Sequence, residues 1–471
     1  MSQAIGTPLT DAPELCRLSA QDLSAGFAAK AFSPVEVTRQ ALHRCDETQQ
    51  AFNAFTHISH ERALAAALAS EARWRQGAPL SPYDGVPATI KDIVSVQGWM
   101  VRHGSTLTPA ENCAQDAPSV ARMRAAGLVF LGLTTTPEFG WKAVTDSPLS
   151  GVTRNPWNAA LTPGGSSGGA AVAAATGAGV FHLGTDGGGS SRLPAAFTGT
   201  AGLKPTFGRV AAFPASPFGT IAHIGPMGRS PQDVEALLSI MSGRDLADWF
   251  QGAAEWPRLD PRTVPPKGKK IGVWTTPPSG QTSPGVARQF DKTLADLADA
   301  GAELIAFDLP MRDQLQEMFN WHWTSGARRR LDLLGQVDSS LIDPDLYQMA
   351  EVARGWTAAD YIGQVTARAG FGSAMNRALA GLDFIVSPAV SVLPFEAGKE
   401  WPPGSHMSRW IEWAGFSYPI NLSQHPAMSV PAGHDESGLQ HAVQIIGALG
   451  ADREVLGLAK WWHHAHPEFF L

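Results

Sequence analysis

Apolar residues recur at helical spacing in several parts of the chain, and this spacing predicts helices. The clearest set has steps of four, four and three residues, which place its side chains on one helix face. Its members are Val286, Phe290, Leu294 and Leu297. The stretch 33–36 (Ser-Pro-Val-Glu) predicts a helix start, because it combines a capping box with a proline in the first turn. Helices are expected at 19–47 (two helices), 61–74, 116–125, 231–241 and over most of 310–380.

Short apolar runs bounded by polar, glycine or proline residues predict strands instead. They lie at 52–58, 128–133, 180–183, 271–274, 303–307, 384–386, 428–430 and 443–446. Another strand-like run begins at Gly85 and carries Lys91 near its end, so a basic side chain closes an apolar segment. The stretch 224–228 (Ile-Gly-Pro-Met-Gly) is not assigned to a strand and is taken to lead into the helix at 231–241.

The stretch 164–210 breaks both patterns, because two glycine runs in it are each followed by a pair of serines. The pairs are Ser166-Ser167 and Ser190-Ser191. An alanine-rich segment at 170–178 lies between them and predicts a buried helix with close backbone contacts. Glycines before a serine can point several backbone N–H groups into one concavity, and such a nest can stabilise an oxyanion in acyl transfer.

A nucleophilic serine in this stretch would need a base. Neither Ser190 nor Ser191 stands in a G-x-S-x-G elbow, which argues against an α/β-hydrolase nucleophile at this pair. Serine–lysine chemistry is the alternative, and Lys91 is the candidate because it ends an apolar run. Burial there would lower the pKa of its amine and permit a neutral base.

Three motifs together resemble the amidase signature family of serine hydrolases. They are GVPATIKD at 85–92, GGSSGG at 164–169 and GTDGGGSSRLPAAF at 184–197. The resemblance extends from about residue 30 to 460 and includes TRNPW at 153–157, PAMSVPAG at 426–433 and QIIG at 444–447.

The resemblance implies a role for each residue of these motifs. Ser190 would be the nucleophile, Ser166 a bridging serine after a cis peptide bond, and Lys91 the base. The two serines are 24 positions apart, as in the family. The oxyanion hole would consist of backbone N–H groups of the loop Gly187, Gly188, Gly189 and Ser190. The chain departs from the family at Gly187, where threonine or isoleucine is frequent, and at Ser191, where a bulkier apolar residue is usual.

Other residues are expected to support this site. Asp186 and Arg192 would brace the loop by hydrogen bonding, with Ser167 beside the bridging serine. Trp141 follows a predicted strand and lies either near the substrate or in the core. The histidine cluster at 463–466 lacks the spacing of zinc ligands. No metal site is therefore expected.

The family resemblance also implies the fold and the domain organisation. The fold class is α/β, a large mixed β-sheet flanked by helices on both faces, with a helical cap. Residues 1–80 would form a helical segment packed on the core, and 81–255 the signature core. A proline-rich linker at 253–270 would lead into a variable cap at 256–382, and 383–471 would return to the core sheet. Within the last part, the aromatic stretch 395–418 is either a mobile loop over the active site or a structural loop.

The implied function is hydrolysis of the C–N bond of amides through an acyl-enzyme, without a cofactor. Aryl amides and carbamates are the substrates considered, and the aromatic-rich cap suggests a neutral, partly aromatic one. Two alternatives stay open. One is the amidase component of a glutamine-dependent tRNA amidotransferase, and the other is a non-catalytic binding protein on the same fold.

Composition limits the classes of binding partner and the cellular compartment that we expect. The net charge of −7 over 471 residues argues against a nucleic-acid or anionic-membrane surface, so a small-molecule amide or carbamate is the expected partner. Three widely spaced cysteines and an N-terminus without signal-peptide features predict a cytoplasmic protein. The sequence leaves open whether the chain forms a homodimer.

Overall fold

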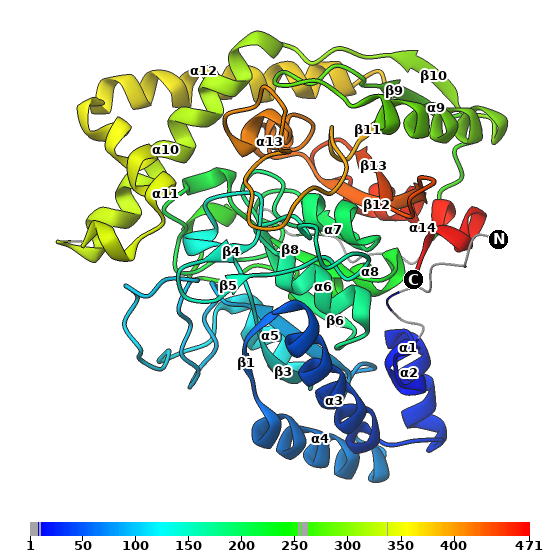
Figure 1. Cartoon of the computed structure of the whole chain (residues 1–471). Coiled ribbons are helices and arrows are strands. Elements are labelled where there is room, and N and C mark those ends of the chain that lie inside the picture. Colours follow the sequence, from blue (N-terminus) through cyan, green and yellow to red (C-terminus); the bar gives the residue numbers. More distant parts are fainter. Residues whose placement is uncertain (1–7, 9–10, 253–255, 257–261, 337) are drawn as a thin grey trace.

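The centre of the protein is one mixed β-sheet with helices on both faces (Figure 1). In the computed structural model, the described residues are 8, 11–252, 256, 262–336 and 338–471. The eleven strands of the sheet follow in spatial order: β1 (Phe55–Ile58), β3 (Val129–Thr134), β2 (Pro87–Lys91), β6 (Phe181–Asp186), β8 (His223–Gly228), β7 (Ala201–Lys204), β12 (Ala427–His434), β13 (Gln440–Ile446), β11 (Phe384–Pro388), β9 (Lys270–Val273) and β10 (Glu303–Ala306). The α/β fold class predicted from the sequence is confirmed.

Both strand directions occur in the sheet. β2 is parallel to β3 and β6, whereas β8 is antiparallel to β6 and β7. β4 (Asp146–Ser147) and β5 (Gly151–Val152) form a separate hairpin. The helices are α1 (Glu14–Arg17), α2 (Ala20–Ala29), α3 (Pro34–Phe52), α4 (His60–Arg75), α5 (Pro118–Ala125), α6 (Gly168–Thr176), α7 (Arg192–Thr198), α8 (Pro231–Met241), α9 (Pro284–Asp299), α10 (Leu315–Leu334), α11 (Pro344–Val352), α12 (Ala358–Leu379), α13 (Tyr418–Ser423) and α14 (Asp452–Ala465).

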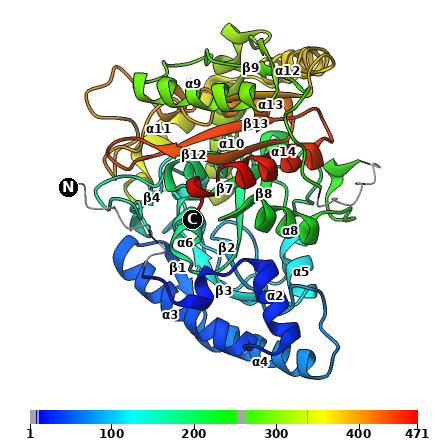
Figure 2. The same ribbon diagram turned by 90° about the vertical axis from the view of Figure 1, so that its right-hand side faces the viewer.

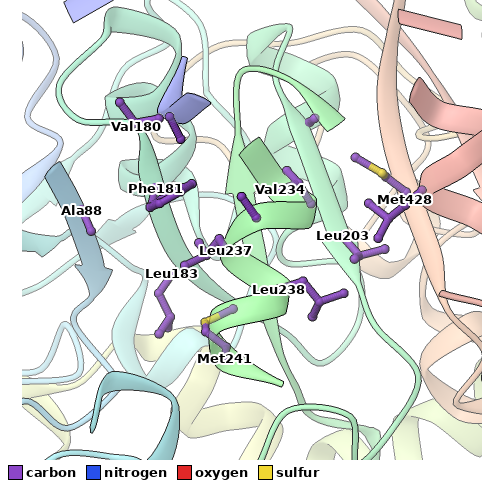
Figure 3. Packing of buried hydrophobic residues seen from close by; sticks show 14 of the residues in the cluster. Ala88, Val180, Phe181, Leu183, Leu203, Val234, Leu237, Leu238, Met241 and Met428 are labelled. Carbon is purple, nitrogen blue, oxygen red and sulfur yellow. The ribbon is translucent and has the colours of Figure 1, made fainter. Parts of the chain in front are cut away.

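Side chains alternate between two apolar clusters on the two faces of the sheet. In β11, Phe384 and Val386 belong to one cluster and Ile385 to the other. This follows from the two-residue repeat of a strand, which sends successive side chains to opposite faces. Figure 3 shows α8 on the first of these faces, where Leu237 and Leu238 lie over residues of neighbouring strands. Figure 2 shows α3 and α4 at one end of the molecule and α9 at the other.

The sequence signals of two helices are reproduced in the structure. The Ser33 side chain accepts a hydrogen bond from the Glu36 N–H, and the Glu36 carboxylate accepts one from the Ser33 N–H, which completes the capping box of α3. All residues of the alanine-rich helix α6 are buried. A Cβ at Gly169 would lie 2.4 Å from the backbone nitrogen of Thr135, so this helix packs with backbone contact as expected.

Two central strands, β7 and β8, were not predicted. β8 carries Gly225, Pro226 and Gly228, which are depleted in strands, so local propensity conceals it. Close packing requires a small residue in this strand, because a Cβ at Gly225 would lie 2.5 Å from the Ser191 hydroxyl oxygen. The structure therefore uses glycine there to bring the sheet against the loop of the second serine pair.

The segment predicted as a variable cap contains both sheet strands and helices. β9 and β10 extend the edge of the central sheet, whereas α10, α11 and α12 stand beside it (Figure 1). Part of the predicted linker, 253–255 and 257–261, lies outside the described residues. The division into four segments stays a prediction. Within the part of the chain that the structure describes, no helix has both the length and the apolar character needed to cross a membrane.

Candidate active site

Lys91 ends the central strand β2 and is fully buried. Its Nζ lies within hydrogen-bond distance of three hydroxyl oxygens, at 2.7 Å from Ser166, 3.0 Å from Ser167 and 3.0 Å from Thr185. None of these partners is a carboxylate. Burial lowers the pKa of the Lys91 amine well below its usual value, and the distant charge of Asp186 opposes this only in part. The surroundings of Lys91 thus favour a neutral amine.

Ser166 stands in the turn that leads into α6, and the peptide bond between Gly165 and Ser166 is cis. The turn is tightly enclosed, because a Cβ at Gly165 would lie 2.7 Å from the backbone of Val144. On the other side, a Cβ at Gly140 would lie 3.3 Å from the Ser166 hydroxyl oxygen. The Ser166 hydroxyl is therefore held between Lys91 and the cavity described below.

Ser190 follows the end of β6 and precedes α7, and its side chain is 6% exposed. Its carbonyl oxygen accepts a hydrogen bond from the Ser167 N–H (3.1 Å), which ties the two serine pairs together. Ser166 and Ser190 both line one cavity. Among the described residues no hydrogen bond joins their two hydroxyls, and such contacts are often longer in unliganded enzymes than in the reacting complex.

The glycine loop before Ser190 does not present all of its amides to the cavity. Gly189 has a φ of +123°, and its N–H donates to the Asp186 carboxylate at 2.9 Å. This N–H is already hydrogen-bonded within the protein, whereas it was expected to help bind an oxyanion. Gly187, Gly188 and Ser190 are the remaining amides of the predicted oxyanion hole. Aromatic side chains cover this part of the loop, since a Cβ at Gly188 would lie 3.0 Å from the ring of Trp410.

Asp186 and Arg192 form the buried ion pair that braces this loop. Arg192 donates to both carboxylate oxygens of Asp186, at 3.0 Å from Nε and 2.9 Å from Nη2. The guanidinium also donates to Gln444 Oε1 and Asn421 Oδ1 from two other segments. Burial by itself raises the pKa of Asp186, but the charge and hydrogen bonds of Arg192 lower it below the usual range. The pair therefore stays charged and fixes the loop to the C-terminal part of the chain.

The cavity beside the serines has a volume of about 280 Å³. One wall carries the hydroxyls of Ser166, Thr185 and Ser190 together with Gly187. The rest of the lining is largely apolar, includes several aromatic rings and comes from several segments. Its aromatic lining residues are Phe139, Phe207, Phe213, Phe218, Phe250 and Trp323. The site thus combines a polar, hydroxyl-rich wall with an apolar enclosure, which suits a small organic molecule with one reactive polar group.

A family model for amidases matches residues 36–456 of the chain. The chain belongs to the amidase family. An acylamidase from Rhodococcus erythropolis is 31% identical over 463 residues, with 96% of each chain covered. A glutamyl-tRNA(Gln) amidotransferase subunit from Nocardia farcinica is 31% identical over 501 residues, which covers 93% of this chain and 96% of that protein.

The fold of this amidase matches a solved structure of the same family over nearly its whole length. A bacterial aryl acylamidase of the amidase signature enzymes superimposes with a TM-score of 0.89 at 26% identity, covering 96% of this chain and 97% of the other. The resemblance inferred from the three motifs is thereby confirmed, and the chain is a hydrolase that acts on amides.

The structure places the Lys91 amine within hydrogen-bond distance of Ser166 and Ser167, and Ser166, Gly187 and Ser190 line the cavity. Trp141 is fully buried and packs in the apolar cluster on the cap side, where its carbonyl oxygen accepts a hydrogen bond from Trp323. It is not one of the described residues that line the cavity, whereas its neighbours Phe139 and Gly140 are.

Several residues at the site were not predicted from the sequence. Thr185 contacts Lys91 and lies within the quoted motif, yet its hydroxyl was not singled out. Trp323 and Arg330 line the cavity from α10, in a region where the sequence pattern indicates helix but not orientation. Within the described ranges, no group of three or more His, Cys, Asp or Glu side chains is arranged to hold a metal ion.

Proposed function

We propose that this amidase cleaves its substrate with Ser190 as nucleophile, Ser166 as bridging hydroxyl and Lys91 as base. The observation that carries the proposal is the buried Lys91 amine, 2.7 Å from the Ser166 hydroxyl, at a cavity that Ser190 also lines. A lysine among hydroxyls and without a carboxylate partner is suited to accept a proton. An ion-paired lysine would be a poor base.

The first half of the reaction forms an acyl-enzyme. The Ser190 hydroxyl proton passes to Ser166, whose own proton passes to the neutral Lys91 amine, while Ser190 Oγ bonds to the amide carbon. The amides of Gly187, Gly188 and Ser190 bind the oxyanion, and one such donor is worth about 3–4 kcal/mol in a protease. The tetrahedral centre then collapses, the C–N bond breaks, and the leaving nitrogen takes the proton back through Ser166.

The second half releases the acyl group. A water molecule gives a proton to the same Ser166–Lys91 relay and attacks the ester carbon. The bond to Ser190 Oγ breaks, the proton returns to Ser190, and a carboxylic acid leaves. A carbamate would react through the same relay and would yield an amine, an alcohol and carbon dioxide.

Aryl amides and aryl carbamates are the proposed substrate class. The aromatic lining of the cavity supports this choice, and so does the similarity to an aryl acylamidase. The test is hydrolysis of a panel of p-nitroanilides and aryl carbamates by the wild type and by Ser190→Ala. Turnover by the wild type and loss in the variant would support the proposal. Equal turnover by both proteins would exclude Ser190 as the nucleophile.

A second candidate function is that of the amidase component of a glutamyl-tRNA(Gln) amidotransferase. The identity of 31% to the Nocardia farcinica protein over almost the whole chain favours it. Such a component would hydrolyse glutamine and deliver ammonia to a partner. Glutamine hydrolysis above anilide hydrolysis, and dependence of activity on a co-purified partner, would favour this candidate. Turnover of anilides by the isolated chain would favour the amidase.

A further inference from the structure

One charged side chain in the cavity has no use in the proposed reaction. Arg330 lies in the last two turns of α10 and contributes to the cavity lining. Its guanidinium carbon lies 4.5 Å from the ring centroid of Phe139, a geometry in which an arginine stacks on an aromatic face. Phe139 and Gly140 connect this position to the reacting groups, because Gly140 packs against Ser166.

Arg330 differs from Arg328 of the same helix, which forms ion pairs. No ion pair or hydrogen bond to it occurs among the described residues, and burial lowers the pKa of its guanidinium without any carboxylate to oppose this. On the same helix, Arg328 pairs with Asp332 and Glu351. A half-buried guanidinium without a partner loses water contacts and gains no hydrogen bond in exchange. Its position in the cavity therefore points to a ligand that supplies a hydrogen-bond acceptor.

The other ionisable groups of the lining do not neutralise Arg330. Burial lowers the pKa of His103 to about 3, and the charge of Arg330 contributes to this lowering, so the ring is neutral at pH 7. His223 is likewise neutral, because burial lowers its pKa well below the usual value. The Asp248 carboxylate accepts hydrogen bonds from two backbone N–H groups, at Ala212 and Phe250, and has no contact with Arg330.

We propose that Arg330 binds a carboxylate of the substrate, so that the enzyme prefers amides whose acyl part or amine part carries an anionic group. This deepens the proposed function and rests on it, and it replaces the neutral substrate suggested by the sequence. A guanidinium offers paired N–H donors that match a carboxylate, and the Phe139 ring supports its plane. The aromatic walls then enclose the rest of the molecule.

The test uses matched pairs of chromogenic anilides. For the acyl side, succinyl 4-nitroanilide is compared with butyryl 4-nitroanilide. For the amine side, the N-acetyl derivative of 5-amino-2-nitrobenzoate is compared with acetyl 4-nitroanilide. We expect the wild type to favour one carboxylate-bearing member by about 10- to 100-fold in kcat/KM, as for a charge-assisted hydrogen bond. The side on which the preference appears identifies the part of the substrate that Arg330 contacts.

Variants separate this role from a general effect on the fold. Arg330→Met should abolish the preference and leave the neutral anilides within about threefold, and Arg330→Lys should retain part of it. Arg329→Met is the matched control, because Arg329 is exposed and does not line the cavity. Equal kcat/KM for the charged and neutral anilides in a wild type that hydrolyses them, or persistence of the preference in Arg330→Met, would overturn the proposal.

A binding experiment keeps the two proposals distinguishable. Calorimetry on Ser190→Ala measures affinity for the same anilides without turnover. Tighter binding of one carboxylate-bearing anilide, lost in Ser190→Ala/Arg330→Met, supports the role of Arg330 even if the wild type hydrolyses none of them. In that case the proposed function fails while the anion site stands. Equal affinity for the charged and neutral members contradicts the anion site.

Discussion

The two sides of the cavity differ in how their polar groups are satisfied. On the sheet side, Lys91 contacts three hydroxyls and Arg192 contacts acceptors from several segments, so each charged or basic group has partners within the protein. On the cap side, Trp323 and Arg330 reach the cavity from α10; Trp323 stacks on Phe218 at 4.1 Å between centroids, and Arg330 has no partner among the residues that the structure describes. The reacting groups are thus fixed in advance, whereas the cap leaves contacts for the substrate to complete.

This contrast supports the proposal that the sheet side carries the chemistry and the cap side the choice of substrate. Removal of a group on the sheet side should lower kcat, because that group acts in the transition state. Removal of a group on the cap side should change KM or the preference among substrates.

The largest expected effect is the loss of the base. Lys91→Met should lower kcat/KM by about 10⁴-fold, because the proton from Ser166 then has no basic acceptor in its place. Lys91→Arg should be equally inactive, since a guanidinium does not deprotonate in proteins. Initial rates on an anilide and circular dichroism measure activity and fold. A Lys91→Arg variant with near wild-type rates would contradict the role of a neutral amine.

The buried ion pair comes next. Asp186→Asn leaves Arg192 without its charge partner in a fully buried site, so the free energy of unfolding should fall by about 3–5 kcal/mol. The loop should loosen too, with a loss of about 100-fold in kcat. Urea unfolding measures the first effect and steady-state kinetics the second.

An exposed ion pair provides the control for that variant. Asp383→Asn removes a contact with Lys269 that is partly exposed, so it should cost no more than about 1 kcal/mol. Equal destabilisation by the two substitutions would show that Asp186 does not brace the loop.

The third effect is the dependence of the rate on pH. The pKa of Lys91 in the folded protein is lowered by burial, so its neutral form is present above that pKa and is lost as pH falls through it. When the chemical step is limiting, kcat/KM should fall about tenfold for each pH unit below this pKa. A profile measured from about pH 5 to about pH 9 checks this. A flat profile over that range would contradict the neutral-lysine mechanism.

The smallest effect should come from the contact that anchors the cap. Lys142 is buried and pairs with Asp343 at 2.8 Å, which joins the core to the segment before α11. Lys142→Met should raise KM about threefold to tenfold and leave kcat nearly unchanged, because the triad does not contact this pair. Lys269→Met, at an exposed pair, should change neither constant. A loss confined to kcat would place Lys142 on the sheet side of the comparison.

The success of prediction from the sequence also differs between the sheet side and the cap side of the cavity. Lys91 was a candidate because it ends an apolar run, and the family resemblance of three short motifs implied Ser166 and Ser190; the structure places Lys91 beside Ser166, at a cavity that Ser190 also lines. The alanine-rich helix α6 was predicted because its composition and its burial agree. The hydrogen bond from the Gly189 N–H to Asp186 was not predicted, since a glycine run does not reveal which N–H groups point outward.

The strands β7 and β8 and the cavity-facing side of α10 could not be predicted, because tertiary contacts decide them. β8 is a strand despite Pro226 and two glycines, since its pairing with β6 and β7 outweighs local propensity. Trp323 and Arg330 both lie on α10, but periodicity does not tell which face meets the cavity. Trp141 and Trp323 are both buried aromatic residues, and yet only Trp323 lines the cavity.

The most direct test of the account is to map the acyl group on a rapidly quenched reaction. The wild type and Ser191→Ala would each be mixed with an activated anilide, quenched in acid, digested and analysed by mass spectrometry. The account predicts that both proteins carry the acyl group on Ser190 and that both turn over. Acylation at Ser191 in the wild type, with loss of acylation in Ser191→Ala, would contradict the assignment of Ser190 as the nucleophile.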